Sequence, residues 1–296
     1  MDIEKLIQIE FSRNIGLLSE DEQRRLLETR IAVAGAGGVG GLHILTLARL
    51  GIGKFNIADN DIFEPVNISR QFGATAHTMG KNKASVLGQM VKDINCHADV
   101  RMFHEGITSD NIPAFLDGVD IFVDGLDFFE IDTRRLVFRA AREKGIFALT
   151  SAPLGFGATL EVFSPKGMSF DEYFAMSDDM AYIEKLAAFA VGLAPHPYHI
   201  RYVDMSRVSL TRRTGPAVSL ACTLAASLIA AEVVKIITGK GQVSPVPHYL
   251  QIDLLRGKLK RGYILMGGRN PLQKLKQWMI LRKARSMNIE DDAQHL

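Results

Sequence analysis

A glycine-rich turn is the feature of the sequence that most restricts the fold. Gly35-Ala36-Gly37-Gly38-Val39-Gly40 fits the pattern G-x-G-x-x-G, follows an apolar run at residues 31–34 and precedes a helical pattern. In such a turn one glycine permits the tight bend, one lets backbone amides approach phosphate oxygens, and one lets the helix pack closely on the strand. The helix N-terminus adds partial positive charge. The motif predicts a nucleotide phosphate site, with a purely structural turn as the alternative, and its candidate binding residues are Gly35, Gly37, Gly38 and Gly40.

Short apolar runs and helical patterns alternate along the first half of the chain. Runs that fit buried strands occur at residues 31–34, 55–58, 121–123 and 146–149, and helical patterns occur at residues 21–28, 83–94 and 131–144. This alternation predicts a parallel sheet that helices cover on both faces. The fold class is therefore α/β, with a Rossmann-like doubly wound sheet, and residues 157–163 alternate like a later strand.

The chain divides into five segments by pattern. Residues 1–29 are expected to form an N-terminal helical arm, and residues 30–163 a Rossmann-like ATP-binding core. Residues 164–214 carry prolines and many aromatic side chains without a sustained period, which indicates a segment that crosses over the active site. Residues 215–266 hold a helix and the late strands that complete the same domain, and residues 267–296 contain a basic C-terminal helix.

The helix in the fourth segment consists mostly of small residues. It is expected to open at Gly215-Pro216 and to stop at Gly239, an arrangement that helix geometry favours. Polar and charged positions interrupt its apolar run, whose charge-free part is shorter than the ~20 residues that a bilayer needs. The pattern favours a buried helix over a membrane span.

Composition narrows the class of protein. Apolar residues make up 47% and charged residues 23% of the 296 positions, which is typical of a soluble globular chain. The formal net charge of +2 gives no general reason to expect nucleic acid as a partner. Cys96 and Cys222 are the two cysteines, and without a C-x-x-C pair no zinc is expected. The N-terminus lacks the apolar stretch of a secretory signal, so a reduced, cytoplasmic location is the expectation.

A carboxylate stands where a dinucleotide fold places its ribose contact. Asp59 ends the second predicted strand, close to the ~20 residues beyond the glycines at which a carboxylate accepts hydrogen bonds from ribose hydroxyls. Asp61, in the stretch that follows, is a further candidate for nucleotide binding. Up to this point the sequence fits a dehydrogenase equally well.

The stretch of sequence after Asp61 carries more basic side chains than the binding of a dinucleotide requires. Asn67, Arg70 and Gln71 lie at i, i+3 and i+4, so on a helical turn they project from one face as a phosphate clamp. Lys81 and Lys83 fall in or just before the first turn of the next helix, where the macrodipole repels each cation by about 0.3–1 kcal/mol. A bound anion would remove this misfit. Lys81 is expected to reach into water, and Lys83 to reach phosphate.

Two carboxylates follow the strand at residues 121–123. Asp124 and Asp127 lie at the carboxyl edge of the parallel sheet, where such sheets bind ligands. Magnesium takes oxygen ligands and usually shares one or two carboxylates with substrate phosphates, so Asp127 alone suffices as its protein ligand. Asp124 serves either this site or as a cap of the following helix.

Together these residues resemble the ThiF/MoeB/HesA-type adenylyltransferases, which activate ubiquitin-like sulfur carriers in molybdopterin and thiamine biosynthesis, and the related ubiquitin-activating enzymes. The resemblance extends over most of the chain, through residues 11–15, the glycine turn, residues 59–71, 80–83 and 124–127, and the helix after Gly215-Pro216. It implies a mixed sheet of eight strands, in which antiparallel strands extend the parallel ones, and a homodimer.

The resemblance also implies roles for single residues. Arg13 of one subunit reaches the triphosphate of the other, Asp59 holds the ribose of ATP, Asp127 binds Mg²⁺, and the phosphates are surrounded by Asn67, Arg70, Gln71 and Lys83. The implied reaction is attack by the C-terminal glycine carboxylate of a ubiquitin-like or sulfur-carrier protein, or of a peptide, on the α-phosphorus. It yields an acyl-adenylate and pyrophosphate. Without the resemblance, Arg13 is simply a charged residue typical of a surface.

The sequence departs from the family pattern at several places. Many relatives carry two C-x-x-C zinc pairs and a cysteine in the crossing segment that takes up the activated carrier, and neither feature is present. Cys222 is expected to be a buried apolar filler, and Cys96 is expected to be structural. The familiar asparagine after the metal-side aspartate is Phe128 here. His196 and His199 are interpreted as ordinary surface histidines and not as a metal pair.

Two other functions remain open at the level of sequence. An NAD- or FAD-dependent oxidoreductase shares the glycine turn and the carboxylate that follows it, and a non-catalytic scaffold subunit of an activating complex shares the fold. The basic helix at residues 272–287 most often presents a solvated face in such a chain, and its functional alternatives are an acidic protein partner or a membrane surface.

Overall fold

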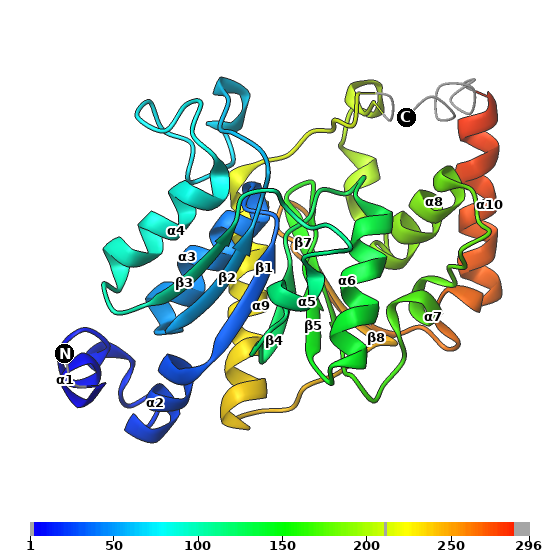
Figure 1. Ribbon diagram of the computed structural model, residues 1–296. Coiled ribbons are helices and arrows are strands. Elements are labelled where there is room, and N and C mark those ends of the chain that lie inside the picture. The colour runs from blue at the N-terminus through cyan, green and yellow to red at the C-terminus, as the bar shows by residue number, and fades with distance from the viewer. Residues whose placement is uncertain (1–2, 210–211, 287–296) are drawn as a thin grey trace.

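Within residues 3–209 and 212–286, which the computed structural model describes, the strands form one nine-stranded sheet of order β3-β2-β1-β4-β5-β7-β8-β9 (Figure 1). The parallel half consists of β1 (Arg30–Ala34), β2 (Lys54–Ala58), β3 (Asp99–Phe103), β4 (Ile121–Asp124) and β5 (Phe147–Thr150). The antiparallel half consists of β7 (Gly157–Phe163), β8 (His248–Asp253) and β9 (Lys258–Tyr263). A two-residue strand, β6 (Pro153–Leu154), pairs with β7 off this path.

The predicted fold class is confirmed, because the sheet is mostly parallel in its first half and antiparallel strands extend it. The resemblance implied eight strands, and the short β6 makes the difference. The sequence did not indicate β3, since Asp99 and Arg101 are exposed on this edge strand and leave no continuous apolar run.

Helices cover both faces of the sheet. On one face lie α2 (Glu20–Glu28), α3 (Gly38–Leu50), α4 (Lys83–Ile94) and α9 (Ser219–Thr238), and on the other lie α5 (Ile112–Phe115), α6 (Ile131–Glu143), α7 (Phe170–Phe174) and α8 (Tyr182–Leu193). Successive side chains of a strand point to opposite faces. In β1, Ile31 and Val33 therefore join the core beneath the first group, whereas Ala32 and Ala34 join the core beneath the second.

The remaining elements lie at the ends of the chain and in its connections. They are α1 (Ile3–Ile9), α10 (Pro271–Ser286) and the 3₁₀ helices η1 (Ser12–Asn14), η2 (Pro65–Asn67), η3 (Tyr198–Arg201), η4 (Met205–Arg207) and η5 (Gly267–Arg269). The segment between β7 and α9 contains α7 and α8, whose buried aromatic side chains pack on the sheet as Phe170, Tyr173, Phe174 and Phe189. Figure 1 shows this segment passing over the edge of the sheet before it reaches α9.

The helix that was expected to open at Gly215-Pro216 begins later, at Ser219. Residue 215 precedes a proline, which disfavours helical dihedrals, and Val218 still has extended backbone dihedrals of φ −129° and ψ 147°. The expected end is correct, because Gly239 caps the helix in the left-handed conformation at φ 78°. By length and hydropathy alone α9 would also fit a membrane span, and its Ala221, Ala225 and Ile229 are buried within the fold.

His43 is a polar residue in the interior of the fold. It lies on α3 with none of its surface exposed, and within the described residues neither ring nitrogen has a hydrogen-bond partner. Burial lowers the pKa of His43 from 6.5 to about 3. The imidazole therefore stays neutral in the folded chain while the unfolded chain takes up a proton below pH 6.5. Stability is lost as the pH falls from 6.5 toward 3.

We expect His43→Leu to remove this part of the pH dependence. Between pH 7 and pH 5, the free energy of unfolding of the wild type should fall by about 2 kcal/mol more than that of the variant. Urea unfolding at both pH values measures the difference. His77→Leu, at an exposed histidine, is the matched control and should behave like the wild type. Equal losses in wild type and His43→Leu would contradict the assignment.

Candidate functional site

The glycine turn between β1 and α3 is pressed against the loop that follows β4. Gly35 has φ +86°, and a Cβ at this position would clash with the backbone of Gly125 and Leu126. A Cβ on Gly40 would clash with the carbonyl oxygen of Gly35. Both positions therefore require glycine, and the two loops meet at the carboxyl edge of the sheet, where the sequence placed the nucleotide.

Asp59 follows β2 directly and stabilises the glycine turn through a hydrogen bond. Its Oδ2 accepts a hydrogen bond from the backbone N–H of Ala36 at 2.6 Å, and its Oδ1 accepts one from the N–H of Asp61 at 2.8 Å. Burial raises the pKa of Asp59, against these two hydrogen bonds and the charge of Lys83. Each carboxylate oxygen has about two lone pairs, so a ribose contact remains open to this side chain.

Lys83 is paired with a carboxylate of the protein. Its side chain is 7% exposed, and its Nζ lies 3.0 Å from Oδ2 of Asp61, whose side chain is 69% exposed. Lys83 is the first residue of α4, and the N-cap is Asn82, whose side chain accepts from the N–H of Ser85. From the sequence, an anionic ligand would relieve the unfavourable position of this lysine, and in the structure Asp61 supplies a negative charge there. An ammonium carries three donors, so further N–H groups remain for a ligand.

The structure contains the turn on which the phosphate clamp was predicted, and whether its side chains bind phosphate stays a prediction. The backbone N–H groups of Arg70 and Gln71 both donate to the carbonyl of Asn67, which makes the tight turn that the spacing indicated. Asn67 instead turns its side chain back, and its Oδ1 accepts from the N–H of Glu64 at 3.0 Å. A Cβ on Gly37 would lie 3.5 Å from Gln71 Nε2, and one on Gly38 would lie 3.6 Å from Arg70 Cγ.

Gln71 carries the clearest sign of a missing ligand at this turn. It is 6% exposed, and its Oε1 has no hydrogen-bond partner among the described residues. Buried polar groups are normally hydrogen-bonded, so an orphaned amide beside Gly37 indicates a polar ligand. Its Nε2, which can donate to an anion, is the side-chain atom nearest to Gly37, and its Oε1 can accept from a further donor.

Asp124 and Asp127 have separate roles. Asp124 is buried, and its Oδ2 accepts hydrogen bonds from Arg134 Nε at 2.7 Å and Thr150 Oγ1 at 2.8 Å. It therefore forms a buried ion pair and does not cap α6, whose N-cap is Glu130. Asp127 is exposed and its Oδ1 accepts from the N–H of Phe129 at 3.0 Å, so this carboxylate can bind a cation that phosphates also hold.

Arg134, which the sequence argument missed, fixes the loop that carries Asp127. Besides the ion pair with Asp124, its Nη2 donates to the carbonyl of Leu126 at 2.7 Å and to that of Asp127 at 3.0 Å. The guanidinium carbon lies 4.5 Å from the ring centroid of Phe189 in α8. The sequence signal that could have identified Arg134 is its position on the helix. Residues 131, 134, 135 and 138 repeat at helical intervals and share the buried face of α6.

The crossing segment contacts the same loop. Tyr182, at the start of α8, donates its hydroxyl hydrogen to the carbonyl of Phe129 at 2.8 Å, and Arg213 pairs with Glu130 at 3.2 Å. Phe128 stands where an asparagine was familiar, and its ring packs on Phe129 and Phe189 at centroid distances of 5.3 and 5.4 Å.

Arg13 lies far from the glycine turn of its own chain. It is exposed on η1, and the neighbouring Asn14 donates to the carbonyl of Leu50 at 3.2 Å, at the last residue of α3. The glycine turn is at the other end of this 13-residue helix, ~20 Å away at 1.5 Å per residue. The structure therefore does not bring Arg13 to the site within one chain.

The cysteines and histidines differ partly from expectation. Cys222 is buried as expected, its Sγ would lie 3.3 Å from a Cβ on Gly38, and burial raises its pKa to about 11. Cys96 is exposed. His196 and His199 are half-buried and not surface residues, because His196 Nε2 pairs with the hydroxyl of Tyr249 at 2.9 Å and burial lowers the pKa of both.

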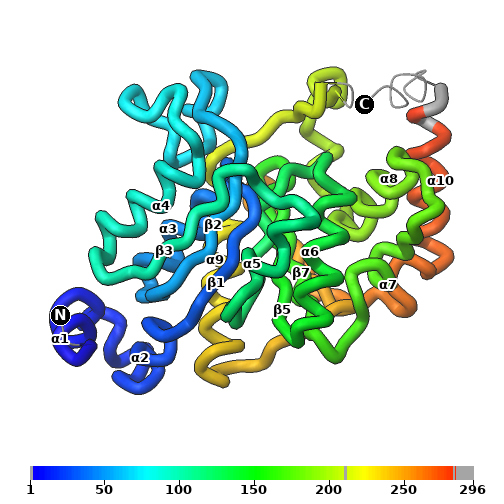
Figure 2. The backbone as a smooth tube through the Cα atoms, in the orientation of Figure 1, coloured from blue at the N-terminus to red at the C-terminus, as the bar shows by residue number. Residues whose placement is uncertain are grey.

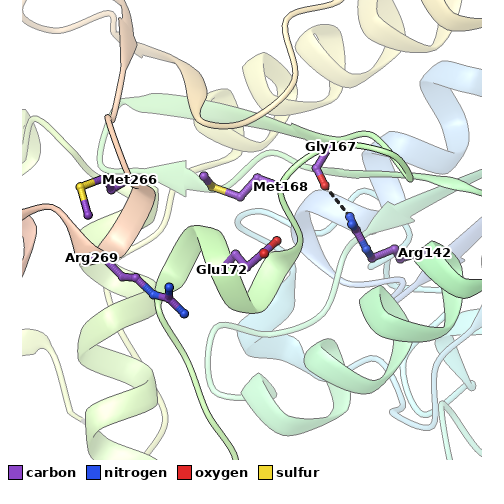
Figure 3. Close-up of a pocket in the computed structure, with 6 residues that line it drawn as sticks. All are labelled: Arg142, Gly167, Met168, Glu172, Met266 and Arg269. Atoms are coloured by element: carbon purple, nitrogen blue, oxygen red, sulfur yellow. Dashed lines mark hydrogen bonds between the residues drawn. The ribbon is translucent and has the colours of Figure 1, made fainter.

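A hollow of about 450 Å³ opens elsewhere on the molecule (Figure 3). It lies between the end of α6, α7 and η5, and one wall is fixed by a hydrogen bond of 2.6 Å from Arg142 Nη1 to the carbonyl of Gly167. The residues that line it are Arg142, Gly167, Met168, Glu172, Met266 and Arg269. None of the predicted site residues is among them.

Comparison with known proteins identifies the relatives of this arrangement. The model of the ThiF family matches residues 11–273. The chain is 37% identical over 101 residues to a tRNA threonylcarbamoyladenosine dehydratase of Haemophilus influenzae, a stretch that covers 34% of this chain and 39% of that protein. It is 35% identical over 143 residues to a sulfur carrier protein ThiS adenylyltransferase of Bacillus subtilis, covering 47% and 42%.

Among solved structures, E. coli MccB in complex with AMPCPP and MccA has the same fold. The TM-score is 0.64 at 20% sequence identity, and the match covers 89% of this chain and 73% of that one. The aligned stretches span between 26% and 58% of the length of the curated relatives.

We expect Arg134→Leu to lower the free energy of unfolding by about 3–5 kcal/mol, because it leaves the buried carboxylate of Asp124 unpaired. The double variant Asp124→Asn/Arg134→Leu should recover part of this loss. Arg139→Leu, on the same helix but with a side chain 40% exposed, is the control and should cost at most about 1 kcal/mol. Denaturant unfolding compares the three, and equal costs for Arg134 and Arg139 would refute a special role of the buried pair.

Proposed function

The chain belongs to the ThiF family, and from this membership we propose that it binds ATP at the glycine turn and transfers the adenylyl group to a carboxylate. The carboxylate attacks the α-phosphorus, a carboxyl oxygen becomes bonded to it, and the bond to the bridging oxygen of pyrophosphate breaks. The products are an acyl-adenylate and pyrophosphate. No residue needs to act as a covalent nucleophile.

The observation that carries this proposal is the position of Arg70 and Gln71 above the first turn of α3. Gln71 Nε2 and Arg70 Cγ lie 3.5 and 3.6 Å from a Cβ built on Gly37 and on Gly38. A phosphate on the backbone amides of this turn would therefore lie beside the Gln71 amide and the Arg70 stem, and the Arg70 guanidinium, which donates to the carbonyl of Val66 at 3.2 Å, has further N–H groups for it. A helix N-terminus, a guanidinium and a donor amide together attract the triphosphate of ATP more strongly than the less highly charged pyrophosphate of the dinucleotide that an oxidoreductase binds.

The residues have separable tasks in the proposed reaction. Asp59 keeps the turn closed through Ala36 and remains available to the ribose, while Asp61 holds Lys83 so that its remaining N–H donors are oriented for phosphate oxygens. Arg70 stabilises charge that develops on the phosphoryl oxygens as the leaving bond stretches. The catalytic gain comes from holding two anions in line, which the residues achieve by position and charge.

Mg²⁺ fits this donor set, because the exposed carboxylate of Asp127 is a single oxygen ligand of the kind that shares the ion with phosphates. When bound, the ion would neutralise part of the triphosphate charge. Asp127 would hold it, and Arg134 would keep the Asp127 backbone in place.

We place Arg13 in the active site of a second subunit. Within one chain it lies at the far end of α3, and a homodimer that brings it across would supply a second guanidinium to the triphosphate. Exposed apolar side chains beside it, Ile9, Ile15 and Leu17, support an interface at this end of the molecule.

The carboxylate most consistent with the relatives belongs to a polypeptide. One relative is named for the sulfur carrier protein ThiS, and MccB was solved together with MccA. We propose a ubiquitin-like or sulfur-carrier protein or a peptide that ends in glycine, in the cytoplasm. A tRNA modification is the second candidate, because two curated relatives are tRNA threonylcarbamoyladenosine dehydratases.

Carrier-dependent exchange of labelled pyrophosphate into ATP tests the reaction. Arg70→Ala and Asp127→Ala should each lower exchange by at least about 100-fold, because each removes charge stabilisation at the reacting phosphates. Lys83→Ala should do the same, whereas Lys81→Ala, at an exposed lysine two residues away, is the matched control and should keep wild-type exchange. Exchange that survives in the Arg70 and Asp127 variants would overturn the residue assignment.

The same assay separates the candidate substrates. A glycine-terminated carrier protein, a glycine-terminated peptide and bulk tRNA are offered in parallel, with binding of NAD measured by calorimetry as the oxidoreductase control. Tight NAD binding without exchange in any arm would replace the proposal by an oxidoreductase, and absence of both ATP and NAD binding would favour a scaffold subunit.

Mixing two inactive variants tests the role of Arg13. Arg13→Ala and Arg70→Ala are each expected to be inactive as homodimers, and their mixed dimer should regain one of its two active centres, because that centre receives both wild-type residues. Pyrophosphate exchange after subunit mixing measures the recovery. Full activity of Arg13→Ala alone would show that this residue is not required.

A further inference from the structure

The C-terminal helix α10 turns its polar side inward and its apolar side outward. Gln273 and Gln277 are buried at 6% and 7% exposure, and each has one polar atom without a partner among the described residues. On the opposite side more than half of each apolar side chain is exposed at Leu272, Leu275, Trp278 and Met279. A helix on the surface of a globular protein normally buries its apolar stripe. This arrangement is inverted: the solvated side of α10 carries these apolar side chains, and the basic Lys274 and Arg282 are exposed as well.

The exposed residues form one continuous stripe, which we call the outer α10 face: Leu272, Leu275, Trp278, Met279 and Arg282. Counted from Leu272, the other four lie three, six, seven and ten positions further along the chain, so all five share one side of the helix. Arg282 is exposed, and its guanidinium carbon lies 5.3 Å from the ring centroid of Trp278.

The polar side of α10 attaches the helix firmly to the fold. α10 packs on α8, and Lys276 Nζ donates to the carbonyl of Pro195 at 2.8 Å. Burial lowers the pKa of Lys276. The helix lies at the outer edge of the molecule, on the opposite side from α4 (Figures 1 and 2). Its outward face is thus fixed by contacts on the other side.

Charge restricts what can cover this face. The helix Pro271–Ser286 contains lysine or arginine at positions 274, 276, 282, 283 and 285 and has no aspartate or glutamate. Pairing with α10 of a second copy would place like charges together, which costs free energy at each close pair. A partner that covers this face must therefore supply negative charge along the helix and accept the apolar side chains of α10 at the centre of the contact.

We propose that the outer α10 face docks on an anionic lipid surface, with α10 lying in the plane of the membrane interface. A protein–protein interface of standard size uses roughly 20–30 residues on each side, far more than one helix face offers. Specific protein partners also use repulsive contacts of both signs to set register, and α10 has charges of one sign only. A bilayer surface needs neither a large shaped interface nor a register.

The composition of the face matches such a surface. Helices that lie in the interface combine leucine and tryptophan on the immersed side with lysine and arginine nearby. Tryptophan prefers the headgroup level, and a long arginine side chain can extend to phosphate while its stem stays in apolar contact. The family match ends at residue 273, so almost all of α10 lies beyond the part of the chain that the family shares. The proposal does not depend on adenylyl transfer.

The chain reports this contact itself, because Trp278 is its single tryptophan. The full-length protein is titrated with vesicles of phosphatidylcholine alone and of phosphatidylcholine with one third phosphatidylserine, and binding is followed by Trp278 emission and by co-sedimentation. We expect a blue shift and sedimentation with the anionic vesicles, weakened by added salt, and little with the neutral ones.

Two variant pairs separate the apolar and electrostatic contributions. Lys274→Gln/Arg282→Gln should lower partitioning about 25-fold, since each basic residue near an anionic surface contributes roughly fivefold. Leu275→Ser/Met279→Ser should lower it further and remove the blue shift. Leu136→Ser, at a leucine of α6 that is 45% exposed, is the matched control and should bind like the wild type. Pyrophosphate exchange is measured on each variant as an independent check of folding.

The outcomes against the proposal are equally distinct. Absence of binding to anionic vesicles overturns it, as does binding that both variant pairs leave unchanged. A Trp278 shift with poly-L-glutamate but not with vesicles would replace the bilayer by an acidic polypeptide. A dimer in sedimentation that Leu275→Ser/Met279→Ser converts to monomer would instead assign the face to a second copy of the chain.

Discussion

The close approach of two backbone loops at the carboxyl edge of the sheet determines the rest of the site. The turn after β1 and the loop after β4 touch at Gly35 and Gly125, so neither position can carry a side chain without moving both loops. This contact sets how far the first turn of α3 extends over the sheet. It thereby also sets the position of the surface, formed by this first turn, on which a nucleotide phosphate would lie. The residues around that surface are positioned relative to it.

The loop after β4 is held from three directions. Arg134 binds its carbonyls from below, Tyr182 binds Phe129 from the crossing segment, and Arg213 pairs with Glu130. Two of these contacts come from the segment between β7 and α9, through Tyr182 and Arg213. That segment therefore helps to fix the loop that carries Asp127.

The sequence predicted the features that depend on local pattern and missed those that depend on packing between distant residues. The strands β1, β2, β4, β5 and β7, the helix at residues 83–94 and the turn that contains Arg70 and Gln71 follow from periodicity and spacing, and the structure contains them. The pairing of Lys83 with Asp61 and of Arg134 with Asp124 joins residues that are 22 and 10 positions apart. No local rule gives such a pair. The first pair changes the interpretation of Lys83, which was expected to reach phosphate, and the second involves Arg134, which the sequence did not single out.

The C-terminal helix α10 shows the same limit of prediction from local pattern. A helical wheel of α10 identifies an apolar stripe and a basic one, but it cannot state which side meets the protein. The packing on α8 settles this, since it buries Gln273 and Gln277 and leaves the apolar stripe outside. An apolar face that the fold leaves uncovered costs free energy in water, and its persistence on a helix that is otherwise well anchored indicates a contact outside the chain.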